Sequence, residues 1–198
     1  KVIVHPENSD IVYVSAIGPL WSKGGDRGLY KTTDGGKSWS NILSFDEHTG
    51  VNDIVMDPRN PDILYASSFQ RRRHVYTYVG GGPGSGMHKS TDGGKSWTEI
   101  NKGLPKTELG RIGLAISPAN PEIIYAIVEA ADGKGGFFAS TNRGASWEKR
   151  GTHKTSGNYY QEIILNKLRK NIYQFLHQPQ RQIQSLSLFY LVFLFCLL

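Results

Sequence analysis

The sequence lacks several features that define common classes of protein. Cys196 is the only cysteine, which excludes a disulfide framework within the chain. Methionine is scarce, with 2 residues, whereas the chain has 23 glycines, 10 tyrosines and 8 phenylalanines. Frequent glycine together with many aromatic residues favours short strands and tight turns over long helices. The composition therefore predicts an all-β protein.

Acidic residues are absent from one end of the chain. Residues 167–198 contain four of the 23 basic side chains and none of the 17 acidic ones. The remaining sequence is therefore close to electrically neutral, and the pI of 9.4 mostly describes this end. Nucleic-acid binding needs a basic surface on the folded body. We expect no nucleic-acid partner.

Long hydrophobic runs are also missing. The apolar run 186–198 is shorter than the roughly 20 residues that span a bilayer. The chain begins at Lys1, inside the strand-like run KVIV, and shows no signal peptide. We expect any such peptide to precede Lys1 in the whole protein.

One eight-residue phrase occurs three times. It reads TTDGGKSW at 32–39, STDGGKSW at 90–97 and STNRGASW at 140–147. Repetition of a local unit indicates an array of similar structural units. The three copies contain three of the four tryptophans. We call these segments the tryptophan turns and expect each to anchor one unit.

A second phrase lies between the tryptophan turns. It reads HPENSDIVYV at 5–14, DPRNPDILYA at 57–66 and SPANPEIIYA at 117–126. Its proline and asparagine predict a turn between two strands. A third strand precedes each tryptophan turn and a fourth follows it. Four-stranded units repeated in this way are typical of β-propeller blades, whereas a β-sandwich would not repeat its turns so literally.

We therefore predict an all-β fold, a β-propeller fragment of about three four-stranded blades with the start of a fourth. No glycine follows Gly157, and no further tryptophan turn occurs. The end of the chain is therefore expected to be an irregular or helical tail, either non-native sequence from a shifted frame or truncated gene, or a membrane-associating segment. The expected blades are 1–50, 51–109 and 110–157, the partial blade is 158–173 and the tail is 174–198.

The tryptophan turns resemble the Asp-box of bacterial neuraminidase repeats, Ser/Thr-x-Asp-x-Gly-x-Ser/Thr-Trp. We expect the acid or amide to accept backbone hydrogen bonds, glycine to take positive φ and tryptophan to pack between sheets. A metal or catalytic role is the alternative, but asparagine in the third copy would lack general-acid chemistry. The structural residues are Asp34, Gly36, Trp39, Asp92, Gly94, Trp97, Asn142, Gly144 and Trp147.

Alternating strand direction places the tryptophan turns on one face and the longer loops on the other. Varied loops on a repeated scaffold are where function usually lies. The loops between the second and third strands are expected at 15–27, 67–85 and 129–135. Those that lead into the next unit are expected at about 43–51, 101–110 and 150–161.

The loop expected at 67–85 has the most unusual composition. Arg71, Arg72 and Arg73 precede Tyr76 and Tyr78. Arginine suits carboxylate or phosphate groups, and aromatic rings suit sugars. The run GGGPGSG that follows is not a P-loop, because no Gly-Lys-Ser/Thr opens a helix there. The alternative is that these arginines pair with acids of adjacent blades.

Carboxylates matter because glycoside hydrolysis usually uses two of them. Asp53 and Glu162 occupy equivalent places at the start of the first strand of their units, and are the candidate acid/base pair. The alternative is that they line the propeller axis and bind water or Arg111. The histidines lack metal-ligand spacing, so we expect no metal and no cofactor.

Longer segments resemble a family of exported bacterial BNR-repeat proteins with a sortilin-type N-terminal propeller, often labelled glycosyl hydrolases. The resemblance covers about 1–173 and implies a larger propeller, whose remaining blades are partners of this chain, and an extracytoplasmic location. The segments are DRGLYKTTDGGKSW, TGVNDIVMDPRNPDILYASSFQRRR, GGGPGSGMHKSTDGGKSW, LGRIGLAISPANPEIIYAIVEA and NYYQEIILN.

Three functions are consistent with the sequence. The first is a carbohydrate-active propeller, hydrolytic or glycan-binding, that acts through its long loops. The second is a sortilin-like module that binds a peptide, with Arg71–Arg73 pairing a carboxylate. The third is an assembly factor with no small-molecule site. Neither the arginine triad of sialidases nor the catalytic acids of xyloglucanases can be placed on this sequence. The candidate sugar platforms are Trp21, Tyr76, Tyr78, Tyr159 and Tyr160.

Overall fold

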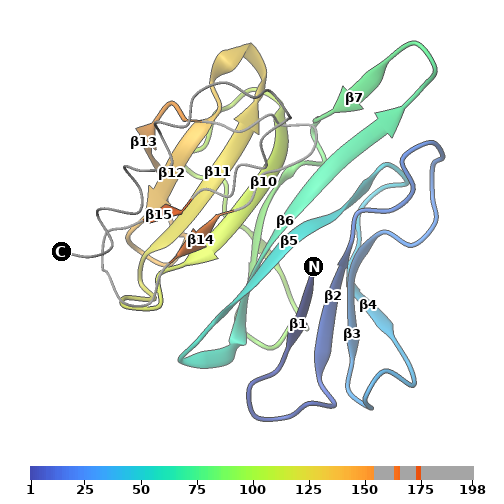
Figure 1. The fold of residues 1–198 in the computed structure, drawn as a ribbon, viewed down its shortest axis with the longest axis vertical. Coiled ribbons are helices and arrows are strands. Elements are labelled where there is room, and N and C mark those ends of the chain that lie inside the picture. The colour runs from blue at the N-terminus through green and yellow to red at the C-terminus, as the bar shows by residue number, and fades with distance from the viewer. Residues whose placement is uncertain (154–162, 166–172, 175–198) are drawn as a thin grey trace, which may run out of the picture.

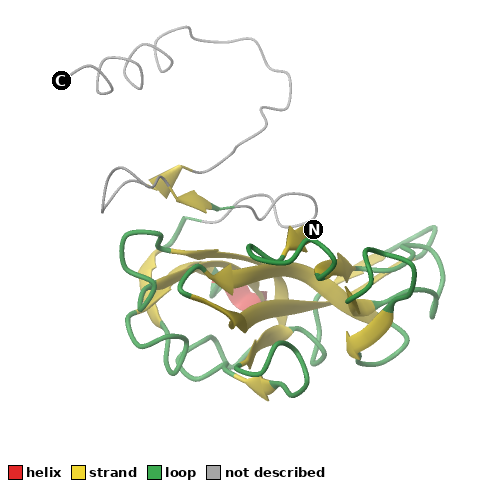
Figure 2. Ribbon diagram, turned by 90° about the horizontal axis from the view of Figure 1, so that it is seen from below, coloured by secondary structure: helices red, strands yellow, loops and turns green. Residues whose placement is uncertain are grey.

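The fold is built almost entirely from β-strands. The computed structural model describes residues 1–153, 163–165 and 173–174. Three antiparallel sheets stand side by side along the chain (Figure 1). Figure 2 shows helix in one short segment, the 3-10 helix η1 at Ala131–Gly133. The prediction of an all-β propeller fragment is confirmed.

The first and third sheets have the same simple topology. Each has four strands, and every strand pairs with the next one along the chain. The first sheet contains β1 (Val2–Val4), β2 (Val12–Ala16), β3 (Gly28–Thr32) and β4 (Ser40–Leu43). The third contains β10 (Leu109–Ile116), β11 (Ile124–Ala130), β12 (Gly136–Ser140) and β13 (Glu148–Gly151).

The second sheet follows the same order with one addition. Its strands run β5-β6-β8-β9, and the short strand β7 pairs with the far end of β6. The bounds are β5 (Thr49–Asp57), β6 (Asn60–Arg73), β7 (Tyr78–Gly80), β8 (Gly86–Ser90) and β9 (Thr98–Glu99).

The expectation of a loop across 67–85 is wrong for its first residues. β6 continues to Arg73, because Thr49 and Gly50 pair with Gln70 and Phe69, and Tyr78–Gly80 then pairs with Arg71–Arg73. The arginine run therefore lies on a β-hairpin that projects beyond the sheet at the upper right of Figure 1.

Two apolar clusters join the three sheets. Successive strand residues point to opposite faces, so Leu64 faces the first sheet and Tyr65 faces the third. Trp97 packs in the cluster between the first and second sheets. Trp147 packs in the cluster between the second and third sheets. Each of these tryptophans thus contacts the sheet that precedes its own, and buried apolar area holds the sheets together.

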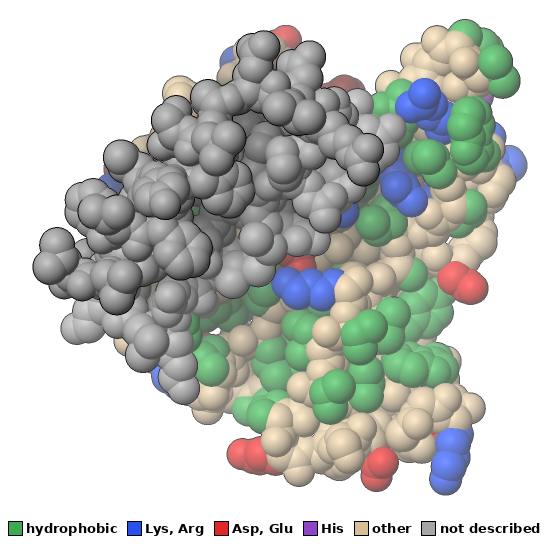
Figure 3. Space-filling view, viewed as in Figure 1, with side chains coloured by type: hydrophobic (Ala, Val, Ile, Leu, Met, Phe, Trp, Pro, Cys, Tyr) green, Lys and Arg blue, Asp and Glu red, His purple; other side chains and the backbone are tan. Residues whose placement is uncertain are grey.

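The outer face of the first sheet carries the same apolar pattern but is exposed. Val14 lies opposite Tyr30 in β2 and β3, just as Ala126 lies opposite Phe138 in β11 and β12. Figure 3 shows hydrophobic side chains gathered over the β1–β4 region. The exposed fractions are 62% for Val2, 53% for Val4 and 43% for Trp39.

The last described strands are β14 (Ile164–Leu165) and β15 (Tyr173–Gln174), which pair with each other. Ile163 is buried in a small cluster with Tyr125 and Phe137 of the third sheet. The tail expected at 174–198 lies almost wholly outside the described residues. Nowhere in the described ranges does a helix have the length and apolar character needed to cross a lipid bilayer.

Candidate functional site

The first tryptophan turn is a closed set of hydrogen bonds. The Asp34 carboxylate accepts from the Ser38 hydroxyl at 2.6 Å, the Ser38 N–H at 3.0 Å and the Thr32 hydroxyl at 2.7 Å. These bonds hold the pKa of Asp34 far below its usual value, and the bond from the Ser38 hydroxyl has the largest effect. Asp92 has the same partners in its own turn and the same downward pKa shift. A carboxylate so held is a poor general acid.

The third turn keeps this geometry without a charge. The Asn142 side-chain oxygen accepts from the Ser146 N–H at 2.9 Å and the Ser140 hydroxyl at 2.8 Å. Its Nδ2 donates to the Ser146 hydroxyl at 2.8 Å, which reverses the direction of the bond made by Ser96. Gly36, Gly94 and Gly144 all have φ between 84° and 90°, the left-handed region that glycine tolerates.

The turns also link neighbouring sheets through a device that the sequence did not reveal. Lys31 Nζ and the Tyr13 hydroxyl both donate to the Gly93 carbonyl, at 2.8 and 3.3 Å. Lys89 and Tyr65 donate in the same way to the Arg143 carbonyl, at 3.0 and 3.3 Å. In the sequence, the available signal was the tyrosine of the second phrase together with the lysine directly before the tryptophan turn. The fold pairs Tyr13 with Lys31 and Tyr65 with Lys89 across adjacent strands.

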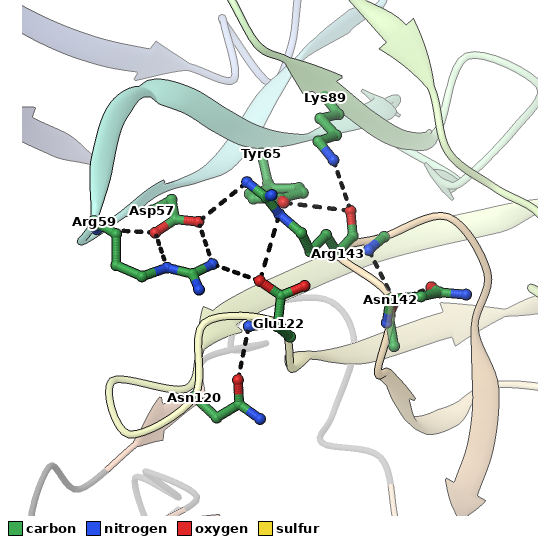
Figure 4. Close-up of polar contacts among 10 residues, drawn as sticks. Asp57, Arg59, Tyr65, Lys89, Asn120, Glu122, Asn142 and Arg143 are labelled. Carbon is green, nitrogen blue, oxygen red and sulfur yellow. Dashed lines mark hydrogen bonds and ion pairs between the residues drawn. The ribbon is translucent and has the colours of Figure 1, made fainter.

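A charged network ties the second and third sheets at the same face (Figure 4). Arg59 contacts the buried carboxylate of Asp57 at 3.1 Å and Glu122 at 2.8 Å. Arg143 adds a longer contact to Asp57 at 3.6 Å. Burial alone would raise the pKa of Asp57, but the hydrogen bonds and charges of the two arginines lower it. Asp57, Arg59 and Glu122 are thus paired with one another, and Arg143 Nε, which makes no hydrogen bond, lies 3.9 Å from Glu122.

Asp53, the described member of the candidate acid pair, is engaged with the scaffold. It lies on β5 next to β10 and is 6% exposed. One carboxylate oxygen accepts from the Ile54 N–H at 2.8 Å and contacts Lys1 Nζ at 2.7 Å. The other accepts from the Leu114 N–H at 2.8 Å. This geometry clips adjacent inner strands together, and Glu162 lies outside the described residues.

Arg111 lies beside this clip and bonds through both its side chain and its backbone to neighbouring residues. The Arg111 Nε donates to the Asn52 side-chain oxygen at 2.6 Å, and the Arg111 backbone N–H donates to the Glu129 carboxylate at 3.2 Å. Asn52 is the bulged residue of β5, where the register with β6 shifts, and its Nδ2 donates to the Ile112 carbonyl at 2.9 Å. The bulge therefore positions Asn52 and Arg111 as a bridge between the second and third sheets.

Arg27 organises the loop that carries Trp21, and sequence reasoning missed it. It is 5% exposed, and its guanidinium donates only to backbone carbonyls. Burial lowers its pKa. A lone arginine before a strand gives no motif, so only the folded loop reveals this role. The acceptors are the carbonyls of Ile17, Pro19, Ser22, Gly24 and His48, at 2.7 to 3.3 Å.

The loop held by Arg27 meets the β6–β7 hairpin and forms an aromatic cluster. The Arg73 guanidinium lies 5.8 Å from the Trp21 ring centre and 5.6 Å from that of Tyr78. Arg71 Nη2 donates to the Gly18 carbonyl at 2.9 Å, which fastens the loop to the hairpin. Trp21 remains 60% exposed. The structure thus brings Trp21 beside Arg73 and Tyr78, which lie on a hairpin far along the sequence.

The tip of the hairpin carries Tyr76, the next candidate. Tyr76 is 88% exposed and stacks on His74, with ring centres 5.9 Å apart. Its ring partner is thus His74, whereas the cluster of Trp21 and Tyr78 is built around Arg73. Tyr159 and Tyr160 lie outside the described residues.

Two cavities flank the hairpin. One, of about 430 Å³, is lined by Lys23, His48, Gln70, Arg71, Arg72, His74 and Val79. The other, of about 360 Å³, lies between β7 and the third sheet and contains Tyr78 together with the carboxylates Glu108 and Glu129. Within the described residues, no group of three or more His, Cys, Asp or Glu side chains is arranged to hold a metal ion.

Known proteins with similar sequences include two that are named as xyloglucanases. The chain is 25% identical over 168 residues to a xyloglucanase of Hypocrea jecorina, covering 80% of this chain and 18% of that protein. It is 28% identical over 85 residues to a probable oligoxyloglucan-reducing end-specific xyloglucanase of Neosartorya fischeri, covering 41% of this chain and 9% of that protein. The chain thus spans less than a fifth of the length of these relatives. No protein-family model matches it.

Solved structures show the same fold. An ancestral GH74 enzyme superposes with a TM-score of 0.55 at 21% identity, over 75% of this chain and 18% of that one. The GH74 enzyme of Niastella koreensis gives 0.51 at 20% identity, over 75% and 22%. The GH74 xyloglucanase of Xanthomonas campestris gives 0.53 at 18% identity, over 74% and 20%. At these identities the likeness establishes the fold: the chain is a fragment of a β-propeller.

Proposed function

We propose that this chain is part of an exported, carbohydrate-active β-propeller that binds a glycan on its loop face. The observation that supports this proposal most directly is the cluster of Trp21, Arg73 and Tyr78. Exposed aromatic rings held in place by a cation suit the apolar faces of sugar rings. The xyloglucanase names of the similar proteins support a polysaccharide as the ligand class.

Hydrolysis is the extension of this proposal that needs two carboxylates beside the bond to be cleaved. Both oxygens of Asp53 have partners within the scaffold, so Asp53 is poorly suited to proton transfer. Glu108 and Glu129 are the alternative candidates, because they line a cavity together with Tyr78, and Glu129 also accepts from the Arg111 backbone N–H. If they act as acid and base, Glu108→Gln and Glu129→Gln should each abolish turnover in the whole protein and preserve binding.

The binding proposal is tested by titration calorimetry with neutral xyloglucan oligosaccharides. Trp21→Ala should weaken binding by about tenfold, because stacking of a sugar on an aromatic ring is lost. Trp39→Ala is the matched control, because Trp39 is also half exposed but lies on the turn face. Equal affinities of wild type and Trp21→Ala would reject the aromatic cluster as the sugar site.

A sortilin-like, non-catalytic peptide site is the second candidate. It is favoured by one observation, the lack of any carboxylate partner for Arg71, Arg72 and Arg73 in the ion pairs of the described residues. The expectation that these arginines pair with acids of adjacent blades is not met there. A peptide array screened against the whole protein tests this candidate, and binding of acidic peptides in preference to glycans would favour it.

We also propose that further blades of the same protein pack on the exposed face of the first sheet. We take 1–50, 51–109 and 110–157 as successive blades and 158–173 as the start of another. The face of β1–β3 repeats the apolar pattern that packs between the other sheets. A neighbouring blade would add a Tyr and Lys that donate to the Gly35 carbonyl, as happens at Gly93.

This packing proposal predicts self-association of the chain when those blades are missing. The double variant Val2→Lys, Val4→Lys should reduce association, because it places charge on the exposed apolar face. Val75→Lys is the control, since Val75 is 95% exposed at the hairpin tip. Sedimentation velocity gives the readout, and unchanged association of the double variant would reject this face as an interface.

A further inference from the structure

Arg72 is the least satisfied cation in the described part of the chain. Its Nε and Nη1 atoms are buried and have no hydrogen-bond partner, and the Nε of its neighbour Arg71 is in the same state. Buried donors without partners are unfavourable, and each is explained by a group that completes the bonding, such as a water, an ion or a ligand. This makes the surroundings of Arg72 the place to look for a missing acceptor.

The cavity at Arg72 is positively charged. Lys23, His48, Arg71 and His74 line it with Arg72, and no carboxylate is among the lining residues. Glu47 makes ion pairs with two of these residues, Lys23 at 3.4 Å and His48 at 3.5 Å. One carboxylate cannot neutralise this set. An anion would find several cationic donors lining one cavity.

The backbone around the cavity holds these donors in place. Arg72 pairs with Val79 across the β6–β7 hairpin, and Arg71 is fastened to the Gly18 carbonyl. Arg27 fixes the loop that carries Lys23, and one of its bonds goes to the His48 carbonyl. The charges are therefore preorganised on rigid elements. Arginine with free N–H groups in a fixed plane is the side chain best suited to bind a carboxylate or sulfate through two bonds.

We propose that this cavity binds the anionic group, a carboxylate or a sulfate, of an acidic saccharide. The inference rests on the proposed glycan-binding function and narrows its substrate class. Trp21, Arg73 and Tyr78 lie on the same loop and hairpin, so a saccharide residue adjoining the anionic group has an aromatic surface within the same assembly. A neutral oligosaccharide would leave the donors of Arg72 without an acceptor.

The test is titration calorimetry of the 198-residue chain with defined probes. Oligogalacturonate carries carboxylates, heparin-derived oligosaccharides carry sulfates, and neutral xyloglucan oligosaccharides carry neither. Inorganic sulfate and an acidic peptide complete the set. Arg72→Met keeps the apolar stem and removes the donors, and Lys23→Ala removes an exposed charge that lines the cavity. Lys37→Ala is the matched control, because it removes one exposed positive charge from the turn face.

We expect an acidic oligosaccharide to bind more tightly than the neutral one. Arg72→Met should weaken that binding by about tenfold or more, since charge-assisted bonds are lost, and Lys23→Ala should weaken it by a smaller factor. Raising the salt concentration from about 0.05 to 0.3 M should weaken it in the wild type and by a smaller factor in Arg72→Met, which has one cation fewer in the cavity. Lys37→Ala should match the wild type. The carboxylate and sulfate probes identify which anion is preferred.

Two results would overturn the inference. If neutral oligosaccharides bind at least as tightly as acidic ones, and Arg72→Met changes neither, the glycan proposal stands and the anion site is rejected. If only the acidic peptide or inorganic sulfate binds, and Arg72→Met abolishes it, the saccharide assignment is rejected along with the proposed function. A thermal unfolding scan of each variant separates loss of a site from loss of the fold.

Discussion

The two faces of this molecule treat polar groups in opposite ways. On the turn face, Asp34, Asp92 and Asn142 have their hydrogen bonds supplied within their own turns. Arg59, Asp57 and Glu122 satisfy one another across two sheets (Figure 4). On the loop face, Arg72 has buried donors without acceptors, and Trp21 is largely exposed.

This difference separates scaffold from site. A protein gains stability by satisfying its buried polar groups, and departures from that rule concentrate where a ligand binds. The turns repeat because every blade needs the same closure and the same link to its neighbour. The loop face is irregular because a binding site occurs once. The repeated acids are thus the wrong place to look for chemistry, and the unrepeated arginines are the better one.

The largest expected effect removes a tryptophan that joins two sheets. Trp147→Ala should lower the free energy of unfolding by about 3 to 5 kcal/mol, because Trp147 is 5% exposed between the second and third sheets and its Nε1 donates to the Ile100 carbonyl. Trp39→Ala, at the equivalent place on the exposed face, should cost only about 1 kcal/mol. Urea denaturation measures both. Equal losses would show that the tryptophans act within their turns and not between sheets.

The next effect tests the charged network of the turn face. Asp57→Asn should cost about 2 kcal/mol at neutral pH, because Asp57 is 1% exposed and its loss leaves Arg59 and Arg143 less compensated. Urea denaturation at a series of pH values gives the readout. Glu7→Gln is the control, since it removes an exposed carboxylate from the turn between β1 and β2 of the first sheet.

The same network has a pH dependence of defined sign. The pKa of Asp57 is lower in the folded chain than in the unfolded one. Its contribution to stability is therefore fully present above the unfolded pKa of about 4 and is lost as pH falls through the lower folded pKa. The loss of stability below about pH 4 should be shallower in Asp57→Asn than in the wild type. Parallel curves would contradict this origin of the acid sensitivity.

A smaller effect probes the link that the sequence did not reveal. Lys89→Met should cost about 1 kcal/mol, because it keeps the stem and removes the bond from Nζ to the Arg143 carbonyl. Lys95→Met is the matched control within the turn itself, where Lys95 is exposed. Thermal unfolding of the two variants is the measurement. If Lys95→Met lowered the stability as much as Lys89→Met, the bond from Lys89 to the Arg143 carbonyl would not explain the loss.

The smallest effect is expected on the loop face and has the opposite sign. Arg72→Met should leave stability unchanged or raise it by up to about 1 kcal/mol, because buried donors without acceptors disappear. The same urea denaturation measures it beside the turn-face variants. A loss of 2 kcal/mol or more would show that Arg72 is part of the scaffold, and the contrast between the two faces would fail.

Much of the fold could be predicted because it is written in local repeats. The phrases around Tyr13, Tyr65 and Tyr125 and the three tryptophan turns each encode a turn and its flanking strands. Local chemistry decides these, since glycine φ angles and side-chain bonds to the nearby backbone act within a few residues. The extent of β6 was missed because Phe69 and Gln70 gain their strand conformation from partners at Thr49 and Gly50.

The candidate site was predicted in parts and assembled only by the fold. Trp21, Arg73 and Tyr78 were each chosen for their residue type, but no spacing in the sequence shows that Arg73 lies between the two rings. Asp53 was chosen for its position at the start of a strand. The hydrogen bond that it accepts from the Leu114 N–H depends on the neighbouring sheet. Arg27 has no sequence signature at all.

The sequence by itself determined the repeating unit, its turns and the face on which they lie, because these follow from interactions between residues close together in the chain. The tertiary structure alone decided which polar groups are satisfied. The Leu114 N–H that donates to Asp53 and the carbonyls that accept from Lys31 and Lys89 come from neighbouring sheets, and the isolation of Arg72 is a property of the cavity around it. Bonding between sheets depends on how they pack, and packing brings together residues that no local pattern connects.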